Sequence, residues 1–339
     1  MSSWQKRKEL KVGVGLGWLI LMSFMLAILP SKVHCAPIEL KVITIWPRSH
    51  KTAQPAQMFA TRMNEAARGE LVIKYLGGPE VIPGRDQPEA VRSGAVDLFF
   101  GPANWTAAAF NFREAEVLMN SAYSPVEERK KGVYDYFLDL HKKKGLYYLG
   151  RFDWREEFYF WTTFPVGKPE DLKGRKLYVP TGFIEVYKAL GIAGVTIPVR
   201  ELYTAMERNA IDGTTLPLPP IRSFGIHELL KYCVDNPMHS SSLVGVANLD
   251  KWNKLPKKLQ DLVANTYAKW EAEELMPWYE QLFSTERKAL EEKGIKFVKF
   301  SPGDTKGFNE IVEEVFWEGI AQKVGDKEYA AKLRKLVGK

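Results

Sequence analysis

The chain has 339 residues, of which 45% are apolar and 26% charged, and its formal net charge is +7 at pH 7. A chain of this length is too long for one ordinary core and predicts two lobes or one large α/β domain. Its composition is that of a globular protein, which excludes a disordered chain and a protein with many membrane spans.

The N-terminus has the layout of a secretory signal peptide. Basic side chains precede an apolar run over residues 12–29, and Pro30 and small or polar residues follow it. That order of charged, apolar and polar regions is typical of export signals. We predict a signal peptide over residues 1–36, cleaved beside Cys35 or Ala36. The alternative is an uncleaved anchor, because the apolar run reaches the lower end of a membrane-spanning length.

Most of the excess positive charge belongs to this segment. It holds five basic residues and one acidic residue, so the formal charge falls from +7 to +3 without it. No later stretch combines Lys and Arg with aromatic residues, and we expect no nucleic-acid partner. The cysteine that remains, Cys233, cannot form an internal disulfide. We expect it to be a buried, inert thiol.

The first half of the remaining chain alternates strands with helices. The hydrophobic pattern predicts strands over residues 40–45, 71–75 and 95–100, with helices over 53–67 and 86–93 between them. This is a β-α-β-α-β unit.

The same order returns later in the chain. Strands are predicted over 176–179, over 195–197 and from residue 210, with helices from 181 and over 201–208 between them. Ala-Val-Asp at 95–97 and Ala-Ile-Asp at 210–212 open the last strand of each unit alike. Two such units predict an α/β protein of two doubly wound lobes, each with a parallel sheet covered on both faces.

The remaining segments are predicted to join and brace the lobes. A helix is expected over 126–144, a long helix over 256–294 with a kink near Pro277, and another over 305–324. We assign residues 37–155 and 243–282 to lobe I, and residues 156–242 and 283–339 to lobe II.

Candidate binding residues follow from where the strands end. In an open parallel α/β sheet, ligands bind beyond the carboxyl ends of the strands. In lobe I this rule selects Trp46, Arg48, His50, the stretch from Gly77 to Arg85, Asn104 and Trp105. In lobe II it selects Tyr178, Thr214, Thr215 and Leu216.

The sequence contains no pattern typical of a catalytic or metal-binding site. The histidines are scattered, with none at the spacing of a zinc site. No nucleophile elbow or phosphate-binding loop occurs. The pair Glu156-Glu157 could serve acid/base chemistry, but we expect it on a solvated face. We therefore expect no enzyme, no metal and no cofactor.

One segment resembles a known family. Residues 169–180, PEDLKGRKLYVP, are similar to the P-E-D-L-K-G-x-K-h-R-V-P segment of DctP-type receptors of TRAP transporters. Residues 201–206 and 209–217, and in the first unit 77–85 and 93–97, resemble further stretches of that family in the correct order. The resemblance extends from about Leu40 to Glu274.

The resemblance implies a periplasmic receptor of the type II binding-protein fold, with two lobes joined by hinge strands and a long bracing helix. Such a receptor closes on a small organic solute and delivers it to the permease subunits of an ion-gradient-driven transporter. We expect a monomer that needs no cofactor.

The departures from the family pattern concern the ligand. The Arg that holds a carboxylate in other members corresponds to Tyr178, the Asn before the proline corresponds to Leu216, and a further Arg falls near Tyr159 or Phe160. Rings and an aliphatic side chain replace polar anchors. We therefore predict an aromatic-lined pocket and an aromatic or hydrophobic organic acid, bulkier or less charged than succinate.

The sequence leaves alternatives open for the anion contact and for the class of protein. Tyr178 could be an ordinary strand residue, with the anion held by Arg48, Arg85 or Arg155. Sequence also does not separate a transport receptor from an adaptor that senses a ligand for a membrane signalling partner, and an exported enzyme on the same frame is a third alternative. The predicted ligand-binding residues are Trp46, Arg48, Arg85, Asn104, Trp105, Tyr159, Tyr178, Thr215 and Leu216.

Overall fold

The computed structural model describes residues 36–339, apart from the side chain of Thr181. The predicted signal peptide therefore lies outside the described residues except for Ala36. Within the described part, no helix is both long enough and apolar enough to cross a membrane.

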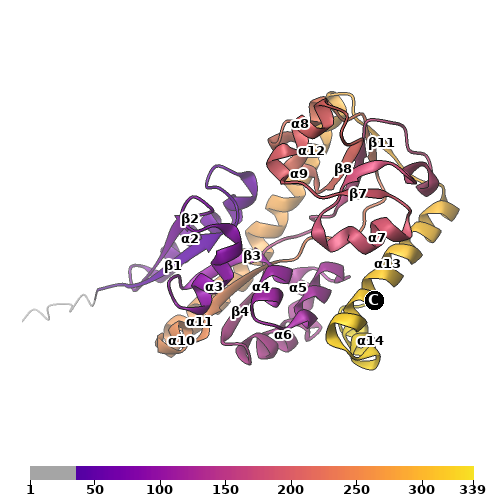
Figure 1. Ribbon diagram of the computed structural model, residues 1–339. Coiled ribbons are helices and arrows are strands. Elements are labelled where there is room, and N and C mark those ends of the chain that lie inside the picture. Colours follow the sequence, from indigo (N-terminus) through magenta and orange to yellow (C-terminus); the bar gives the residue numbers. More distant parts are fainter. Residues whose placement is uncertain (1–35) are drawn as a thin grey trace, which may run out of the picture. The chain divides into compact units, whose positions relative to one another are not determined.

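Two sheets organise the chain (Figure 1). The first sheet contains, in spatial order, β2 (Leu71–Gly77), β1 (Ile38–Thr44), β3 (Leu98–Pro102), β10 (Leu243–Asn248) and β4 (Leu146–Arg151). The second contains β11 (Lys296–Val298), β9 (Tyr232–Val234), β5 (Tyr159–Thr162), β8 (Gly213–Leu216), β6 (Lys176–Tyr178) and β7 (Ala193–Val195). Each sheet with its helices is called a lobe below.

Helices follow the strands as the hydrophobic pattern predicts. The first lobe carries α2 (Gln54–Ala67), α3 (Gln87–Arg92), α4 (Ala103–Ala109), α5 (Pro125–Lys130), α6 (Val133–Lys142), α10 (Leu249–Lys254) and α11 (Lys257–Trp270). The second carries α7 (Ile184–Ala189), α8 (Leu202–Glu207) and α9 (Leu218–Ser223). The chain ends with α12 (Met276–Glu292), α13 (Pro302–Val324) and α14 (Lys327–Leu336).

Both faces of each sheet are covered by apolar side chains. In β1, Val42 and its neighbour Ile43 belong to different buried clusters, and in β5 the same is true of Phe160 and Trp161. Successive side chains of a strand point to opposite faces, so this division means that helices pack on both sides of each sheet. The prediction of a two-lobed, doubly wound α/β fold is confirmed.

The prediction that the sheets are parallel is wrong for one place in each. β10 runs antiparallel between β3 and β4, and β5 runs antiparallel between β8 and β9. Each of these strands arrives directly from the other lobe, so it enters its sheet from the opposite direction. The two sheets therefore share one topology, with a strand inserted next to the β-α-β-α-β unit.

The repeated Ala-Val-Asp and Ala-Ile-Asp segments have the same structural role. Asp97 accepts a hydrogen bond from the Lys41 N–H at 2.8 Å and donates its own N–H to the Lys41 carbonyl at 3.0 Å. Asp212 does the same with Lys176, at 3.0 and 2.6 Å. In each lobe the carboxylate thus extends the ladder between the first and third strands of the unit.

The long C-terminal helix is interrupted where Pro277 requires it. Residues Glu271–Leu275 form a π-helical turn between α11 and α12, and Pro277 lies in the first turn of α12. A proline lacks an N–H and its ring clashes with the carbonyl four residues earlier, here Glu273, so the turn widens. The predicted helix over 126–144 is instead two helices, separated at Gly132, whose φ is +79°.

The C-terminal helices contact both lobes. On α13, Phe308 and Val312 belong to a cluster of the second sheet, whereas Trp317 and Ile320 pack with the first. On α14, Leu333 packs with the first sheet as well. The lobe boundaries predicted from sequence stay a prediction, but the core contacts of residues 317–337 are those of lobe I rather than of lobe II, to which we assigned them.

Replacing Asp97 with alanine should lower the free energy of unfolding by about 1–3 kcal/mol, because the N–H of Lys41 then loses its charged acceptor. Chemical denaturation measures the change. The control is Asp139→Ala, since that side chain is 73% exposed and takes part only in a long surface ion pair. Equal losses in the two variants would contradict the assigned role of Asp97.

Candidate cleft between the lobes

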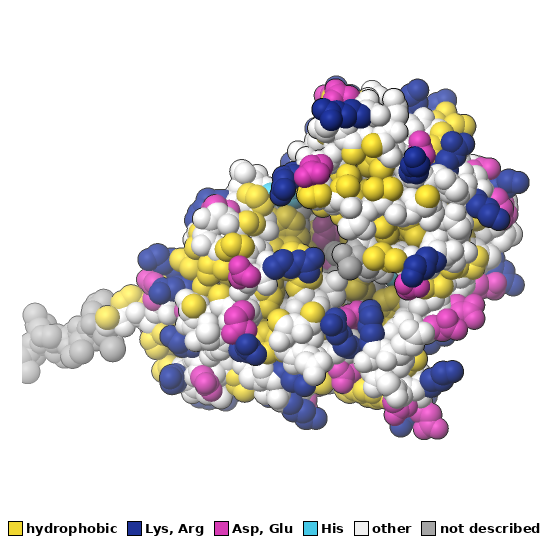
Figure 2. All heavy atoms as spheres, in the orientation of Figure 1, with side chains coloured by type: hydrophobic (Ala, Val, Ile, Leu, Met, Phe, Trp, Pro, Cys, Tyr) yellow, Lys and Arg dark blue, Asp and Glu magenta, His cyan; other side chains and the backbone are white. Residues whose placement is uncertain are grey.

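The carboxyl ends of the parallel strands in both sheets adjoin the two segments that connect the lobes. Residues 152–158 lead from β4 to β5, and residues 235–242 lead from β9 to β10. The two connections pair with each other through the Phe158 and Ser241 N–H groups, which donate to the His239 and Glu156 carbonyls at 3.1 and 2.8 Å. Figure 2 shows a hollow in the surface between the two lobes, with apolar side chains on both sides of it.

Three of the predicted residues of lobe II lie on one face of the second sheet. Tyr159 pairs with Leu216, and Tyr178 pairs with Thr214, so their side chains share a face. Their exposed fractions are only 7–9%, and burial raises the pKa of both tyrosines. The Tyr159 hydroxyl donates to Glu157 Oε2 at 2.6 Å. This is an apolar wall with little free polar surface.

Thr215 lies on the opposite face of that sheet. It pairs with Phe160, is fully buried, and its hydroxyl contacts the Tyr187 hydroxyl at 2.7 Å. The structure therefore does not bring Thr215 together with Tyr178, because neighbouring residues of a strand point in opposite directions.

The predicted residues of lobe I form two groups. Arg85 lies over the ring of Trp105 with its guanidinium carbon 4.0 Å from the ring centre, and Asn104 comes directly before that tryptophan in α4. Trp46 follows β1 and packs edge-on against Phe152 with 6.4 Å between ring centres. All of these residues adjoin the ends of β1 and β3.

The three candidate arginines differ in how their donors are used. Arg48 donates to the backbone carbonyls of Leu76 and Tyr75 at 2.8 and 3.3 Å and lies over the Tyr75 ring. Arg85 is exposed and makes no hydrogen bond or ion pair with any residue that the structure describes. Arg155 is exposed too, and its φ of +55° is unusual for a non-glycine residue. The donors of Arg48 are thus used by the end of β2, whereas those of Arg85 and Arg155 are available to an anion.

Glu156 is not on a solvated face, contrary to our expectation. It is 4% exposed, whereas its neighbour Glu157 is half-buried. The reason is that residues 152–158 form the buried connection between lobes, which the sequence pattern did not distinguish from a surface strand.

A charged contact that the sequence did not indicate joins the lobes beside these connections. Glu286 on α12 is 1% exposed and lies between Lys51 of lobe I, at 2.5 Å, and Arg222 of lobe II, at 3.1 Å. Next to it the His50 ring contacts the Ser223 hydroxyl at 3.3 Å, and burial lowers the pKa of that histidine. His50, a predicted strand-end residue, therefore lies at a contact between the lobes.

The groups needed for metal or thiol chemistry are not assembled in the described part of the chain. Among residues 36–339, no three side chains of His, Cys, Asp or Glu are grouped as metal ligands would be. Cys233 is fully buried, and burial raises the pKa of its thiol. A buried thiol of this kind is a poor nucleophile.

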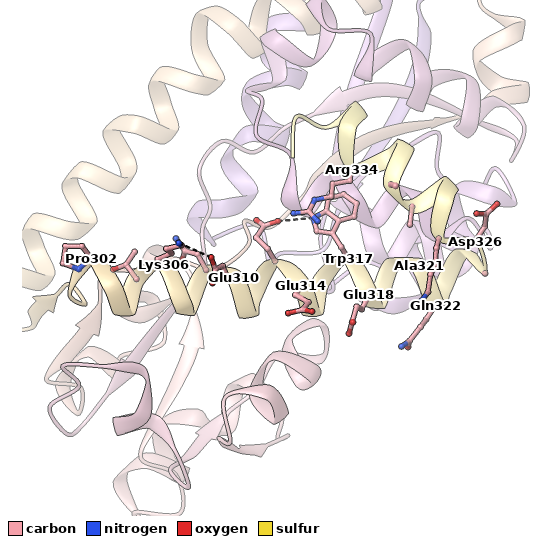
Figure 3. A pocket seen from close by; sticks show the side chains of 17 residues that line it. Pro302, Lys306, Glu310, Glu314, Trp317, Glu318, Ala321, Gln322, Asp326 and Arg334 are labelled. Carbon is pink, nitrogen blue, oxygen red and sulfur yellow. Dashed lines mark hydrogen bonds and ion pairs between the residues drawn. The ribbon is translucent and has the colours of Figure 1, made fainter.

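A separate groove lies between α13 and α14 (Figure 3). Its volume is about 1260 Å³, and Glu310, Glu314 and Glu318 along α13 and Arg334 on α14 are among its lining residues. None of the predicted ligand-binding residues lines it. The groove is therefore distinct from the hollow at the strand ends.

Comparison with known proteins identifies the family. A model of the family described as bacterial extracellular solute-binding protein, family 7, DctP, matches residues 42–323. The chain belongs to this family. The resemblance to DctP-type receptors predicted from residues 169–180 is thereby confirmed.

Individual relatives are distant but cover most of this DctP-family chain. A monocarboxylate 2-oxoacid-binding periplasmic protein of Nostoc sp. is 22% identical over 86% of this chain and 82% of its own. The Bordetella pertussis receptor DctP7, solved with pyroglutamic acid, has a TM-score of 0.74 at 17% identity and covers 89% and 99% of the two chains. A TRAP periplasmic solute-binding protein of Xanthobacter autotrophicus, solved with β-D-galacturonate, has a TM-score of 0.72 at 20% identity, covering 88% and 97%.

Replacing Glu286 with glutamine should lower the free energy of unfolding by about 1–3 kcal/mol, because Lys51 and Arg222 then lose a charged acceptor. Urea denaturation measures the loss. The control is Glu292→Gln on the same helix, an exposed residue 4.0 Å from Lys288. No difference between the two variants would mean that the contact adds nothing to stability.

Proposed function

We propose that the protein is the periplasmic receptor of a TRAP-type transporter. It binds one small organic acid in the hollow at the strand ends and delivers the solute to the membrane permease subunits of an ion-gradient-driven transporter. In this proposal the receptor performs no chemical reaction and uses no cofactor. The observation that carries the proposal is the joint presence of the family match over residues 42–323 and paired connections at the carboxyl ends of both sheets.

The side chains at the strand ends support an acid with a sizeable apolar part. Tyr159, Tyr178 and Leu216 provide rings and an aliphatic group on the lobe II side, and Trp46 and Trp105 provide rings on the lobe I side. Aromatic side chains bury large areas and stack on planar ligands. Among the reported relatives, ligands include a 2-oxoacid, pyroglutamic acid and galacturonate, which are small organic acids.

The anion contact is proposed for Arg85, with Arg155 as the second candidate. A guanidinium makes two parallel hydrogen bonds with a carboxylate, and Arg85 has donors not used by any residue that the structure describes. Its position over the Trp105 ring places the guanidinium next to an aromatic surface. Arg48 is a weaker candidate, because its donors are held by backbone carbonyls.

A panel of acids tested by thermal shift should separate ligand classes. We expect aromatic or bulky monoacids to raise the unfolding temperature and succinate or malate to leave it unchanged. A ligand at a hundredfold excess over its Kd stabilises the folded state by about 2.7 kcal/mol. Stabilisation by small dicarboxylates alone would contradict the predicted solute class.

An acid that stabilises the protein in that panel can then be used to test the anion contact of Arg85. Arg85→Gln should weaken its binding by about tenfold or more, which corresponds to losing a charge-assisted hydrogen bond. Arg48→Gln is the matched control and should bind nearly as the wild type does. Isothermal titration calorimetry measures both, and equal losses in the two variants would exclude Arg85 as the selective contact.

An adaptor that senses the same solute for a signalling partner is the second candidate function. Reconstitution with a permease distinguishes the two, because a transport receptor makes solute uptake into vesicles depend on its presence. Binding without any stimulation of uptake would favour the adaptor.

A further inference from the structure

Two buried carboxylates lie in the connection between the lobes and share one hydroxyl group. Ser241 Oγ is 3.0 Å from Asp153 Oδ2 and 2.8 Å from Glu156 Oε2. Both carboxyl groups are almost completely buried, with residue exposures of 1% and 4%. No other function described above uses this pair.

The hydrogen-bond geometry favours a proton on one of the two acids. A serine hydroxyl has a single hydrogen and can donate to one carboxylate only. The second short contact is then a hydrogen bond only if that carboxyl group is protonated and donates to Ser241 Oγ. Two buried carboxylates that both carry charge next to one hydroxyl would repel each other without compensation.

One cation acts on Asp153 but is shared with another acid, and none acts on Glu156 among the described residues. Arg151 on β4 is the nearest guanidinium that acts on Asp153, but it also pairs with Glu128 of α5 at 3.3 Å. From the long helix, the hydroxyl of Tyr279 is buried without a partner among the described residues, and Asp153 Oδ1 is likewise unpartnered. Burial raises the pKa of Tyr279, and the charges of Glu156 and Asp153 raise it further. Burial and the charge of Glu271 chiefly raise the pKa of Tyr267 of α11, to which Asp153 adds.

We propose that Asp153, Glu156 and Ser241 form a proton-binding site whose occupancy depends on the arrangement of the two lobes. The two acids belong to the first connection and Ser241 to the second, and the Ser241 N–H also donates to the Glu156 carbonyl. A motion that opens the lobes rotates these backbones, admits water and separates the hydroxyl from the pair. Once water reaches the carboxyl group, burial no longer raises its pKa. The proton therefore leaves to solvent at neutral pH.

The proton belongs to Glu156. Burial, and after it the charge of Asp153, raises the pKa of Glu156 to about 8, whereas burial raises that of Asp153 to about 6 against the opposing effect of Arg151. A folded-state pKa above the unfolded value gives stability that is complete below the unfolded pKa. That stability is lost as the pH rises through the folded pKa. The contribution of Glu156 to the stability of the packed connection should therefore fall as the pH rises from about 5 to about 8.

The first test counts the proton. Urea unfolding of the wild type between about pH 5 and about pH 8 should show that the folded state binds about one more proton than the unfolded state through Glu156. Glu156→Gln keeps the shape, donates from its amide to Ser241 and should lose that share of the pH dependence. Glu292→Gln changes the same charge on the surface and should keep it. Equal slopes in wild type and Glu156→Gln would overturn the proposal.

The second test measures whether protonation of Glu156 is linked to the arrangement of the two lobes, and it requires no solute. Small-angle X-ray scattering should give the wild type a larger radius of gyration at about pH 9 than at about pH 6, while Glu156→Gln keeps its radius at both. If Glu156→Gln does not fold, Asp153→Asn should move the wild-type transition to lower pH, because it removes the charge that raises the pKa of Glu156. A radius that does not change with pH in the wild type, or changes equally in the variants, would overturn the linkage.

Discussion

The exchange of one strand between the two lobes is the constraint on which the rest of the structure depends. β5 follows β4 directly yet enters the second sheet, and β10 follows β9 yet enters the first. Because each strand arrives from the other lobe, it runs antiparallel to its neighbours, and its entry point lies at the edge where the parallel strands end. The connections therefore cross at the edge that, in α/β proteins, also binds ligands. The connections between the lobes therefore lie beside the hollow at the strand ends.

This arrangement explains why the region between the lobes is both apolar and charged. The sheet surface contributes side chains such as Tyr159 and Tyr178, which pack as part of a buried cluster. The connections contribute backbone that must be buried, and with it polar side chains that need partners inside the protein. Ser241 forms hydrogen bonds with the two acids. Glu286 forms ion pairs with Lys51 and Arg222. The polar groups thus lie at contacts between the two connections or between the two lobes.

Several motifs that stood out in the sequence prove to be structural. The two Ala-x-Asp segments anchor the third strand of each unit to the first, through Asp97 and Asp212. Arg48, placed after the end of β1, donates to carbonyl groups of the neighbouring strand β2. By contrast, Arg85 and Trp105 come from separate segments and meet only in the fold. Position at a strand end therefore does not by itself tell which side chains have free donors or meet in the fold.

The sequence by itself determined the repeated strand and helix order, the family through residues 169–180, and the division into two lobes, because these depend on local periodicity and on contiguous motifs. It placed the kink near Pro277 for the same reason. Only the tertiary structure decided that Thr215 faces away from Tyr178, that Glu156 is buried, and that the second half of α13 and α14 pack on the first lobe. These facts depend on strand register and on contacts between residues far apart in the chain, such as Ser241 with Asp153. A local pattern carries no information about them.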